Sequence, residues 1–345
     1  MRCPSTTDTV TGTFIKSKLI VYYDTTNRPR RGKTTFIYFD KHKSKSIAQI
    51  WQEVIKMTYN IFNEDCVHYM ECLNTEKFDL TFLDPPFNQG KDYKMCSDTL
   101  NPDVYWDWIN YICKLVYKNT SKGGAIYFMH REKNIEYVMY ALRNAGWTFQ
   151  NLIIWKKKTS AVPSPNRYGK HHQVIVFATK GNKPRVFNKI RIDPPLLVTQ
   201  KIPRKNGIFV TDVWDDIREL TSGFYAGKEP LRLDSGERSH KQQSPVKLVM
   251  RMILSSSNVG DMVFDPFAGT GTTAICADQL QRDSISVDNA TFNVSLIENR
   301  LSELRECDNI CNFRNEYSFT KNIDEIFPES TNEPGYQIPL NPDEN

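Results

Sequence analysis

The sequence predicts an α/β fold built on a parallel sheet. Two observations carry this prediction: short apolar runs typical of buried parallel strands, and amphipathic segments of helical length between them. They alternate in two blocks, on either side of an irregular, proline-rich stretch. Alternating strands and helices build a parallel sheet covered by helices. With 345 residues, the chain can form one large domain with an insert, or two domains.

The first block contains four expected strands, at 59–62, 80–83, 125–129 and 151–155. A helix is expected after the second strand, because Trp106, Ile109, Ile112, Cys113 and Val116 fall on one helical face. The glycine-containing residues 121–124 are expected to end it, as a C-terminal cap does. A second helix is expected over 134–145.

The second block begins with a helix. Ser244 is the expected N-cap and Pro245 the first helical residue. An apolar stripe follows at helical spacing, made of Val246, Val249, Met250, Ile253 and Leu254. A strand at 262–264, a helix over 272–280 and a strand at 284–287 complete the block.

The stretch between the blocks, 156–238, is interpreted as an insert with a job different from that of the sheet. Residues 156–205 contain thirteen Lys/Arg and a single acid, Asp193, although the whole chain carries a net charge of only +5. Clustered cations neutralise phosphates, so this stretch favours a nucleic-acid partner. A solvated charged surface is the alternative that the composition leaves open.

The two ends differ in charge. Residues 14–45 carry nine bases and two acids. Residues 313–345 carry seven acids and two bases, and this tail is rich in Pro and Asn. We expect this acidic tail to be poorly ordered. Eight scattered cysteines without a CxxC pair, the lack of a long apolar run and an N-terminus without a signal peptide predict a cytoplasmic protein without membrane contact.

A glycine loop follows the strand at 262–264. Its sequence is DPFAGTGTTA, residues 265–274, and Gly269 and Gly271 allow backbone angles and close approach that a Cβ would forbid. Asp288 ends the next strand, where an acid can accept hydrogen bonds from a ribose diol. A P-loop is excluded because Thr272, not lysine, follows Gly271. A dinucleotide, S-adenosylmethionine (AdoMet) and a turn without ligand remain open.

A second motif, Asp84-Pro85-Pro86-Phe87, follows the strand at 80–83. A carboxylate at the carboxyl end of a buried strand points into the ligand crevice of an α/β sheet. The two prolines are rigid and donate no backbone hydrogen bond, so Asp84 and a nearby carbonyl can accept from an exocyclic amine. Phe87 offers a face on which a base can stack. A second Asp-Pro-Pro, at 193–195, has no buried strand before it and is assigned to a loop.

These two motifs resemble the strongest motifs of the DNA amino-methyltransferases, [D/N/S]-P-P-[Y/F] and F-x-G-x-G. They occur here at 84–87 and 267–271, tetrad first and with a basic stretch between them, which is the order of the β-group. Residues 239–245 are similar to the H-P-x-Q-K-P segment at His240, Gln243 and Pro245, but depart from it at Lys241 and Ser244. Residues 63–66 resemble G-D-C, and 212–214 resemble D-V-W. The resemblance covers roughly residues 59 to 304.

The resemblance implies a Rossmann-like AdoMet-dependent methyltransferase, a three-layer sandwich with an inserted target-recognition region. Its parts would be a basic N-terminal extension (1–56), a catalytic half (57–155), the recognition insert (156–238), an AdoMet-binding half (239–312) and the acidic tail (313–345). The catalytic residues implied are Asp84, Pro85, Pro86 and Phe87. The cofactor residues implied are Asp65, Cys66, Asp84, His240, Gln243, Ser244, Asp265, Phe267, Gly269, Gly271, Thr272 and Asp288.

The activity implied is methyl transfer to adenine N6 in double-stranded DNA, with cytosine N4 as the alternative. Asp84 favours adenine, because family members acting on cytosine N4 more often carry Ser-Pro-Pro-Tyr. No metal is expected. The implied DNA contacts are Lys156, Lys157, Lys158, Arg167, Lys170, Arg204 and Lys205. A homodimer and a separate cognate restriction endonuclease are compatible with the resemblance. An NAD-dependent oxidoreductase would leave Asp84–Phe87 without a role, and a DNA-binding module would explain the basic stretch alone.

Overall fold

The computed structural model describes residues 10–15, 18–23, 59–89, 100–158, 165–194, 204–220, 227–233, 235–239 and 242–328. The chain divides into two compact units, Met1–Lys56 and Met57–Asn345. In the first unit, the described residues form an antiparallel hairpin of β1 (Val10–Ile15) and β2 (Lys18–Tyr23). All functional features described below belong to the second unit.

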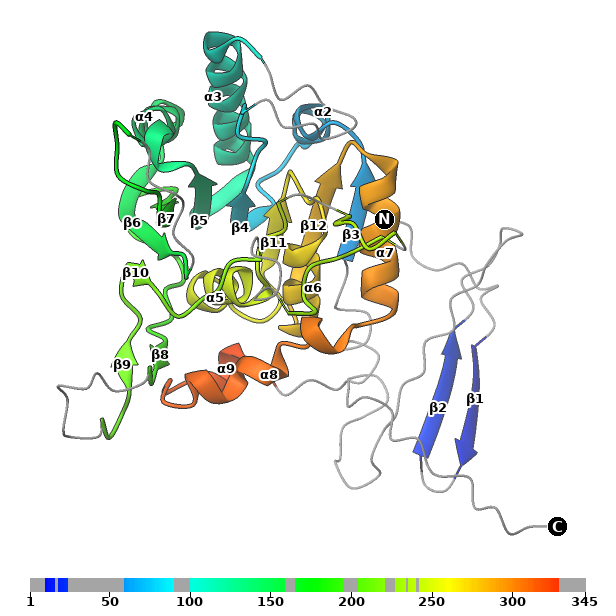
Figure 1. Cartoon of the computed structure of the whole chain (residues 1–345). Helices are drawn as coiled ribbons and strands as arrows, with labels where there is room; N and C mark the ends of the chain where they lie inside the picture. The colour runs from blue at the N-terminus through cyan, green and yellow to red at the C-terminus, as the bar shows by residue number, and fades with distance from the viewer. Residues whose placement is uncertain are drawn as a thin grey trace. The chain divides into compact units, whose positions relative to one another are not determined.

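An eight-stranded sheet forms the centre of the second unit (Figure 1). Its order is β10-β6-β7-β5-β4-β11-β12-β3, and every pairing is parallel except the two made by β7. The strands are β3 (Tyr59–Asn63), β4 (Phe78–Leu83), β5 (Thr120–His130), β6 (Thr148–Lys156), β7 (His172–Thr179), β10 (Val213–Trp214), β11 (Met262–Asp265) and β12 (Asp283–Asp288). The predicted α/β class is confirmed.

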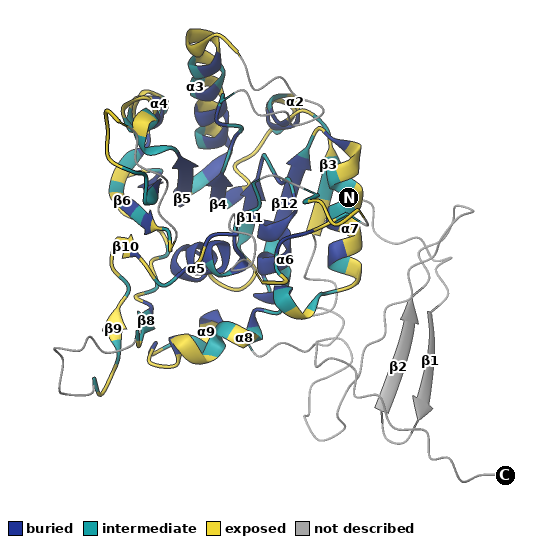
Figure 2. Ribbon diagram, in the orientation of Figure 1, coloured by how far each residue is buried: buried dark blue, intermediate teal, exposed yellow. Residues whose placement is uncertain are grey.

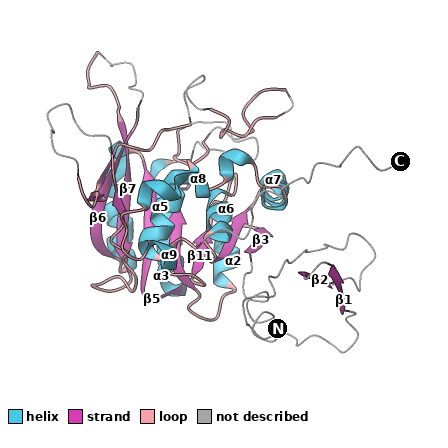
Figure 3. Cartoon of the chain, turned by 90° about the horizontal axis from the view of Figure 1, so that it is seen from below, coloured by secondary structure: helices cyan, strands magenta, loops and turns pink. Residues whose placement is uncertain are grey.

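Two layers of helices cover the sheet, as Figures 1 and 3 show. One core cluster joins the sheet to α2 (Cys66–Glu71), α3 (Pro102–Asn119) and α4 (Ile135–Ala145). The other joins it to α5 (Val246–Ser256) and α6 (Thr272–Gln279), and α7 (Thr291–Ser302) packs beside β3 and β12. Figure 2 shows the central strands β5, β4, β11 and β12 and helix α5 largely buried. None of the described helices is long and apolar enough to cross a membrane.

The stretch 156–238, interpreted as an insert with a job different from that of the sheet, contributes the strands β7 and β10 to the sheet. Strand β7 pairs with both β5 and β6, so it lies inside the sheet, and β10 extends the edge beside β6. A short apolar run such as 173–177 does not reveal which sheet it joins, because partner choice depends on the tertiary structure. The rest of the stretch includes the small pair of β8 (Arg191–Ile192) and β9 (Ile208–Phe209).

Residues 121–124 also differ from the prediction. They do not end a helix but belong to β5, which starts directly after α3 at Thr120. Gly124 is required by close packing, because a Cβ there would lie 2.5 Å from Thr120 Cγ2 and 3.0 Å from the Asp79 carbonyl oxygen. A glycine pair therefore marks a close approach of two strands here, and not a helix cap.

The expectation of a poorly ordered tail from residue 313 is wrong for its first part. Residues 313–328 include the end of α8 (Cys311–Arg314) and all of α9 (Ile323–Ile326), and Tyr317 and Phe327 are fully buried. Buried Arg282 holds this segment, since its Nη1 donates to the Ile326 carbonyl oxygen at 2.6 Å. The prediction rested on the acidic composition of the whole tail. A few apolar residues in its first part are sufficient to anchor the chain to the α5 side of the core.

Phe327→Ala should lower the free energy of unfolding by about 3–5 kcal/mol, because it removes a fully buried aromatic ring and leaves a cavity. Phe319→Ala is the matched control, since Phe319 lies in the same segment with 36 % of its surface exposed, and it should cost less than about 1 kcal/mol. Urea denaturation followed by circular dichroism measures both. Equal, small losses would mean that the segment does not pack on the core.

Candidate active site

The site lies where β4 and β11 end side by side. The two strands are parallel neighbours, with Leu80 opposite Val263 and Thr81 opposite Phe264, so the segments that follow them leave the same edge of the sheet. A crevice at the carboxyl ends of such strands is the usual ligand site of an open α/β sheet. Here it contains a cavity of about 730 Å³. The predicted site residues that line it are Asp65, Cys66, Asp84, Pro85, Pro86, Ser244, Asp265, Phe267, Gly269, Thr272 and Asp288.

One hydrogen bond joins the two halves of the site. Ser244 Oγ donates to Asp84 Oδ2 at 3.1 Å. The predicted N-cap role of Ser244 is wrong by one residue, because Pro245 occupies the cap and α5 starts at Val246. Glu229 replaces the missing cap, since its Oε1 accepts the Val246 N–H at 2.7 Å. The Ser244 hydroxyl is thus directed at the tetrad carboxylate and not at the helix.

Two carboxylates hold the glycine loop in shape. Asp265 Oδ1 accepts the Phe267 N–H at 3.0 Å and Oδ2 accepts the Thr273 hydroxyl at 2.5 Å, and burial raises the pKa of Asp265 to about 6. Asp288 Oδ2 accepts the Gly269 N–H at 2.8 Å. The loop is therefore held in place by residues from both strands that flank it, before any ligand binds.

Asp288 keeps room for a ligand. Its Oδ1 accepts from the Ala290 N–H at 2.9 Å and from Asn293 Nδ2 at 3.0 Å, and Oδ2 accepts from Gly269. An ionised carboxylate can accept about four hydrogen bonds. Three are made within the protein, which leaves capacity for a further donor at the cavity wall.

Gly271 lies outside the cavity lining and has a packing role. It caps α6 with a φ of 75°, in the left-handed region, and a Cβ there would lie 2.7 Å from Ile297 Cγ1 and Cγ2. The residue thus lets the loop approach α7. Thr272, which follows it, lines the cavity and accepts from Arg300 Nη1 at 3.2 Å.

Two other predicted residues are placed differently from the expectation, and a third is not described. Gln243 does not line the cavity, because its Oε1 accepts the Leu231 N–H at 2.9 Å and its Nε2 donates to the Glu229 carbonyl oxygen at 3.1 Å. Phe87 is 5 % exposed and its ring lies against His130, at 4.7 Å between ring centroids, so its face is not open to a base here. His240 lies outside the described residues.

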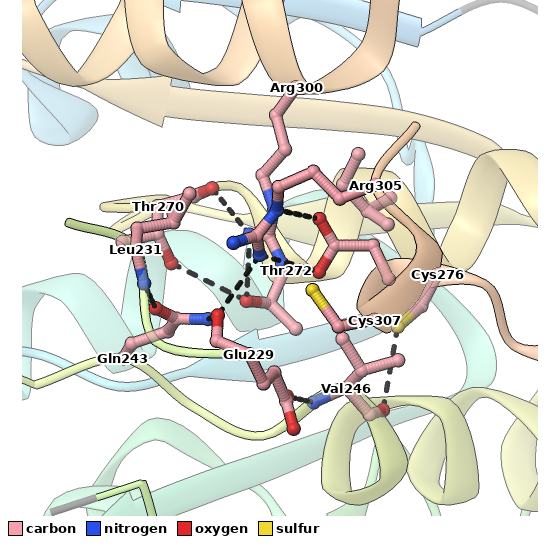
Figure 4. A network of polar contacts seen from close by, with 12 residues as sticks. Glu229, Leu231, Gln243, Val246, Thr270, Thr272, Cys276, Arg300, Arg305 and Cys307 are labelled. Carbon is pink, nitrogen blue, oxygen red and sulfur yellow. Dashed lines mark hydrogen bonds and ion pairs between the residues drawn. The ribbon is translucent and has the colours of Figure 1, made fainter. Parts of the chain in front are cut away.

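A polar network braces the loop from behind (Figure 4). Arg300 Nη1 donates to the Thr270 carbonyl oxygen at 2.7 Å and Arg305 Nη2 donates to the Glu229 carbonyl oxygen at 3.0 Å. Both guanidinium groups pair with buried Asp308, at 2.6 and 2.7 Å. The network connects the glycine loop to the segment that carries Glu229 and, through Val246, to the start of α5.

The predicted DNA contacts divide into two groups. Lys156, Lys158, Arg167 and Lys205 are exposed. The others have partners: Lys157 Nζ lies 5.2 Å from the Trp155 ring centroid, Lys170 Nζ lies 2.6 Å from Glu132 Oε1, and Arg204 Nη1 lies 3.5 Å from Asp193 Oδ1. Glu132 precedes the basic stretch in the chain, so its pairing with Lys170 could not be read from local charge.

Several lining residues were not predicted. Tyr105 and Trp108 come from α3, and Asn289, Phe292 and Asn293 come from the segment after β12. The second group could have been found, because segments at the carboxyl ends of parallel strands form the crevice. The first could not, since an aromatic residue on a helix next to an apolar stripe reads as part of the core.

The open sheet, the glycine loop and the Asp-Pro-Pro-Phe tetrad at one crevice define a Rossmann-like domain of the AdoMet-dependent methyltransferase class. Within that class, the chain belongs to the N6/N4 methyltransferase family described as DNA methylase, whose model matches residues 78–299, more than half of the chain. The predicted family is thereby confirmed, and the protein is a DNA methyltransferase.

Curated relatives agree with this membership. The chain is 30 % identical over 256 residues to the type II methyltransferase M.HpaI of Haemophilus parainfluenzae, covering 74 % of this chain and 78 % of the relative. It is 27 % identical over 248 residues to the DNA adenine methyltransferase YhdJ of Escherichia coli (strain K12), covering 66 % and 77 %. Among solved structures, the cytosine-N4-specific PvuII DNA methyltransferase has the same fold, with a TM-score of 0.54 at 17 % identity over 78 % of this chain and 93 % of that one.

The half-buried Glu229 generates a pH prediction. Burial raises its pKa to about 7, against an ordinary value of 4.5. Between these two pH values the folded state holds a proton that the unfolded state has lost, so Glu229 makes the protein less stable as pH rises, and the loss is complete just above pH 7. From pH 5 to pH 8, the wild type should therefore lose roughly 2 kcal/mol relative to Glu229→Gln, which cannot ionise.

Urea unfolding of both proteins at pH 5 and pH 8 measures this difference. The comparison cancels every other titrating group, and the glutamine Oε1 can still accept the Val246 N–H. Parallel pH profiles for the two proteins would contradict the assigned ionisation of Glu229.

Proposed function

We propose that this protein transfers the methyl group of AdoMet to the N6 amine of an adenine flipped out of double-stranded DNA. The observation that supports this most is that the tetrad and the glycine loop line one cavity, in which Ser244 donates a hydrogen bond to Asp84. Adenine is favoured because the tetrad begins with Asp84, whereas family members acting on cytosine N4 more often have serine there. Transfer to cytosine N4 is the alternative, since relatives and structural neighbours include enzymes of both kinds.

The cavity suits AdoMet. Its volume of about 730 Å³ lies within the range of small-molecule sites. Asp288, with acceptor capacity left at the end of β12, would hold the ribose hydroxyls. Asp65 and Cys66 line the same cavity at the start of α2, where they would contact the adenine ring of AdoMet. Gly269 and Thr272 supply loop backbone and a hydroxyl to the wall.

The tetrad would prepare the target amine. Its nitrogen lone pair is conjugated into the base ring, and hydrogen bonds from the amine to Asp84 and to the Pro85 carbonyl would draw it toward tetrahedral geometry and expose that pair. AdoMet supplies a methyl group on a positively charged sulfur, so the protein contributes mainly alignment and electrostatic stabilisation. The target amine is inside the duplex, and the base must leave the stack to reach the cavity.

The exposed cations Lys156, Lys158, Arg167 and Lys205 would contact phosphates and direct the duplex to the crevice. We also propose a place in a restriction-modification system with a separate cognate endonuclease, which the similarity to the type II methyltransferase M.HpaI supports. A homodimer is a further expectation, which a sedimentation measurement would settle.

Incubation with radiolabelled AdoMet and unmethylated plasmid DNA, followed by digestion to nucleosides, tests the reaction. Label in N6-methyladenine supports the proposal and label in N4-methylcytosine supports the alternative. A folded, AdoMet-binding protein that transfers no label to DNA would contradict both the proposal and the alternative.

Asp84→Ala should lower the transfer rate by roughly 10²-fold or more, because the polarising acceptor for the amine is lost, yet leave AdoMet affinity within a few-fold. Asp193→Ala is the matched control, since Asp193 belongs to the second Asp-Pro-Pro and pairs with Arg204. It should keep the wild-type rate. Loss of AdoMet binding in Asp84→Ala would contradict the role assigned to its carboxylate.

Alanine at Lys156, Lys158, Arg167 or Lys205 should weaken DNA binding equally for all sequences and reduce the slope of log K against log salt by about 0.9 for each phosphate contact removed. Lys114→Ala, an exposed lysine of α3, is the control and should leave the slope unchanged. Fluorescence anisotropy with a labelled duplex over a salt series measures these slopes. Identical slopes in all five variants would place the DNA on another surface.

A further inference from the structure

The two prolines at the centre of the tetrad have no backbone donor. Pro85 and Pro86 lack an N–H group, so neither can be held in place by donating a backbone hydrogen bond. Their backbone can be held through its carbonyl oxygens. Asp84 is reached by Ser244, and the Pro86 carbonyl is reached by a side chain from a different layer of the fold.

That side chain is Tyr105, in the first turn of α3. Its hydroxyl donates to the Pro86 carbonyl oxygen at 2.7 Å. The residue is 2 % exposed, yet it lines the cavity beside Asp84 and Pro85. A buried hydroxyl in this position fixes the peptide that follows Pro86, and with it the direction in which the tetrad presents its acceptors.

His130, at the end of β5, contacts the Tyr105 hydroxyl. Its Nδ1 accepts the Arg131 N–H at 2.8 Å and faces Asn134 Nδ2 at 3.4 Å. A neutral imidazole whose Nδ1 is an acceptor carries its proton on Nε2. Nε2 lies 3.0 Å from Tyr105 Oη, so the ring donates to the tyrosine oxygen while the tyrosine donates to Pro86.

The protonation state supports this direction. His130 is fully buried, and burial together with the neighbouring Arg131 lowers its pKa to about 3. The ring is therefore neutral at neutral pH. Its face also lies against Phe87, at 4.7 Å between centroids, so the same imidazole contacts the last residue of the tetrad and the hydroxyl that holds the third.

We infer that Tyr105 and His130 are positioning residues for methyl transfer, acting through one directed chain of hydrogen bonds from the Arg131 N–H to the Pro86 carbonyl. This inference rests on the proposed function, because the geometry of the tetrad matters only if its acceptors meet a target amine. Neither residue exchanges a proton with the substrate. Their effect is to keep the Pro85–Phe87 backbone in the arrangement that receives the base.

Tyr105→Phe tests the inference by removing one oxygen atom. In full-length protein preloaded with radiolabelled AdoMet and mixed with plasmid DNA, the single-turnover rate should fall roughly 10-fold, because a buried carbonyl loses its donor next to the reacting atoms. The dissociation constants of AdoMet and of DNA should stay within about twofold, since the removed hydroxyl donates to the Pro86 carbonyl oxygen and the phenyl ring keeps its place in the cavity wall.

Tyr127→Phe is the matched control. Tyr127 is another buried tyrosine, on β5, and its hydroxyl lies 2.7 Å from Ser256 Oγ, away from the cavity lining. It should lose thermal stability as Tyr105→Phe does but keep the wild-type transfer rate. Equal rates in the two variants, or a Tyr105→Phe rate equal to wild type, would overturn the inference.

Two conservative variants at His130 separate its two nitrogens. Glutamine places an amide donor near the Nε2 position, whereas asparagine reaches only the Nδ1 position. His130→Gln should retain most of the transfer rate, and His130→Asn should lower the rate as much as Tyr105→Phe does. The double variant Tyr105→Phe/His130→Asn should show no further loss of rate. Additive losses in the double variant would mean that the two residues act separately. Failure of the wild type to methylate DNA would count against the proposed function and not against this chain of hydrogen bonds.

Discussion

The parallel pairing of β4 with β11 is the interaction on which the site depends. These strands belong to segments far apart in the sequence, and their pairing places two loop starts at one edge of the sheet. Asp84 follows one strand and the glycine loop follows the other. Both motifs line the cavity at that edge, and the Ser244 hydroxyl joins Asp84 to the segment that precedes α5. Any change that shifts this register would separate the proposed methyl donor from its acceptor.

A second layer of buried charge keeps that edge rigid. Asp308 has no exposed side-chain surface, and Arg300 beside it is almost equally buried. Burial alone would favour the neutral acid, but hydrogen bonds from Arg300 and Arg305 outweigh it and lower the pKa of Asp308. Buried ion pairs contribute little net stability unless every polar group is satisfied. Here the remaining guanidinium donors reach the carbonyls of Thr270 and Glu229, so the network defines the loop geometry.

Much of the site followed from local sequence, and the exceptions share a cause. Asp84 directly follows β4, Asp265 and Asp288 end β11 and β12, and Gly269 lies in the loop after β11. Their position at the crevice therefore depends only on recognising those strands. Gln243 and Phe87 matched a motif equally well, but neither lines the cavity, because Gln243 bonds to the 229–231 segment and Phe87 packs on His130. A motif identifies residues near a site. It does not predict which group a side chain of the motif hydrogen-bonds to or packs against.

Residue spacing within short stretches was enough to predict the α/β class and to find both motifs, and the order of the motifs is read directly along the chain. The tertiary structure decided the place of β7 inside the sheet, the packing of residues 313–328 and the chain of hydrogen bonds through Tyr105 and His130. Each of these features joins segments from different parts of the chain. Strand pairing, burial and hydrogen-bond direction are set by which surfaces meet, and a local pattern of residues carries no information about its partner.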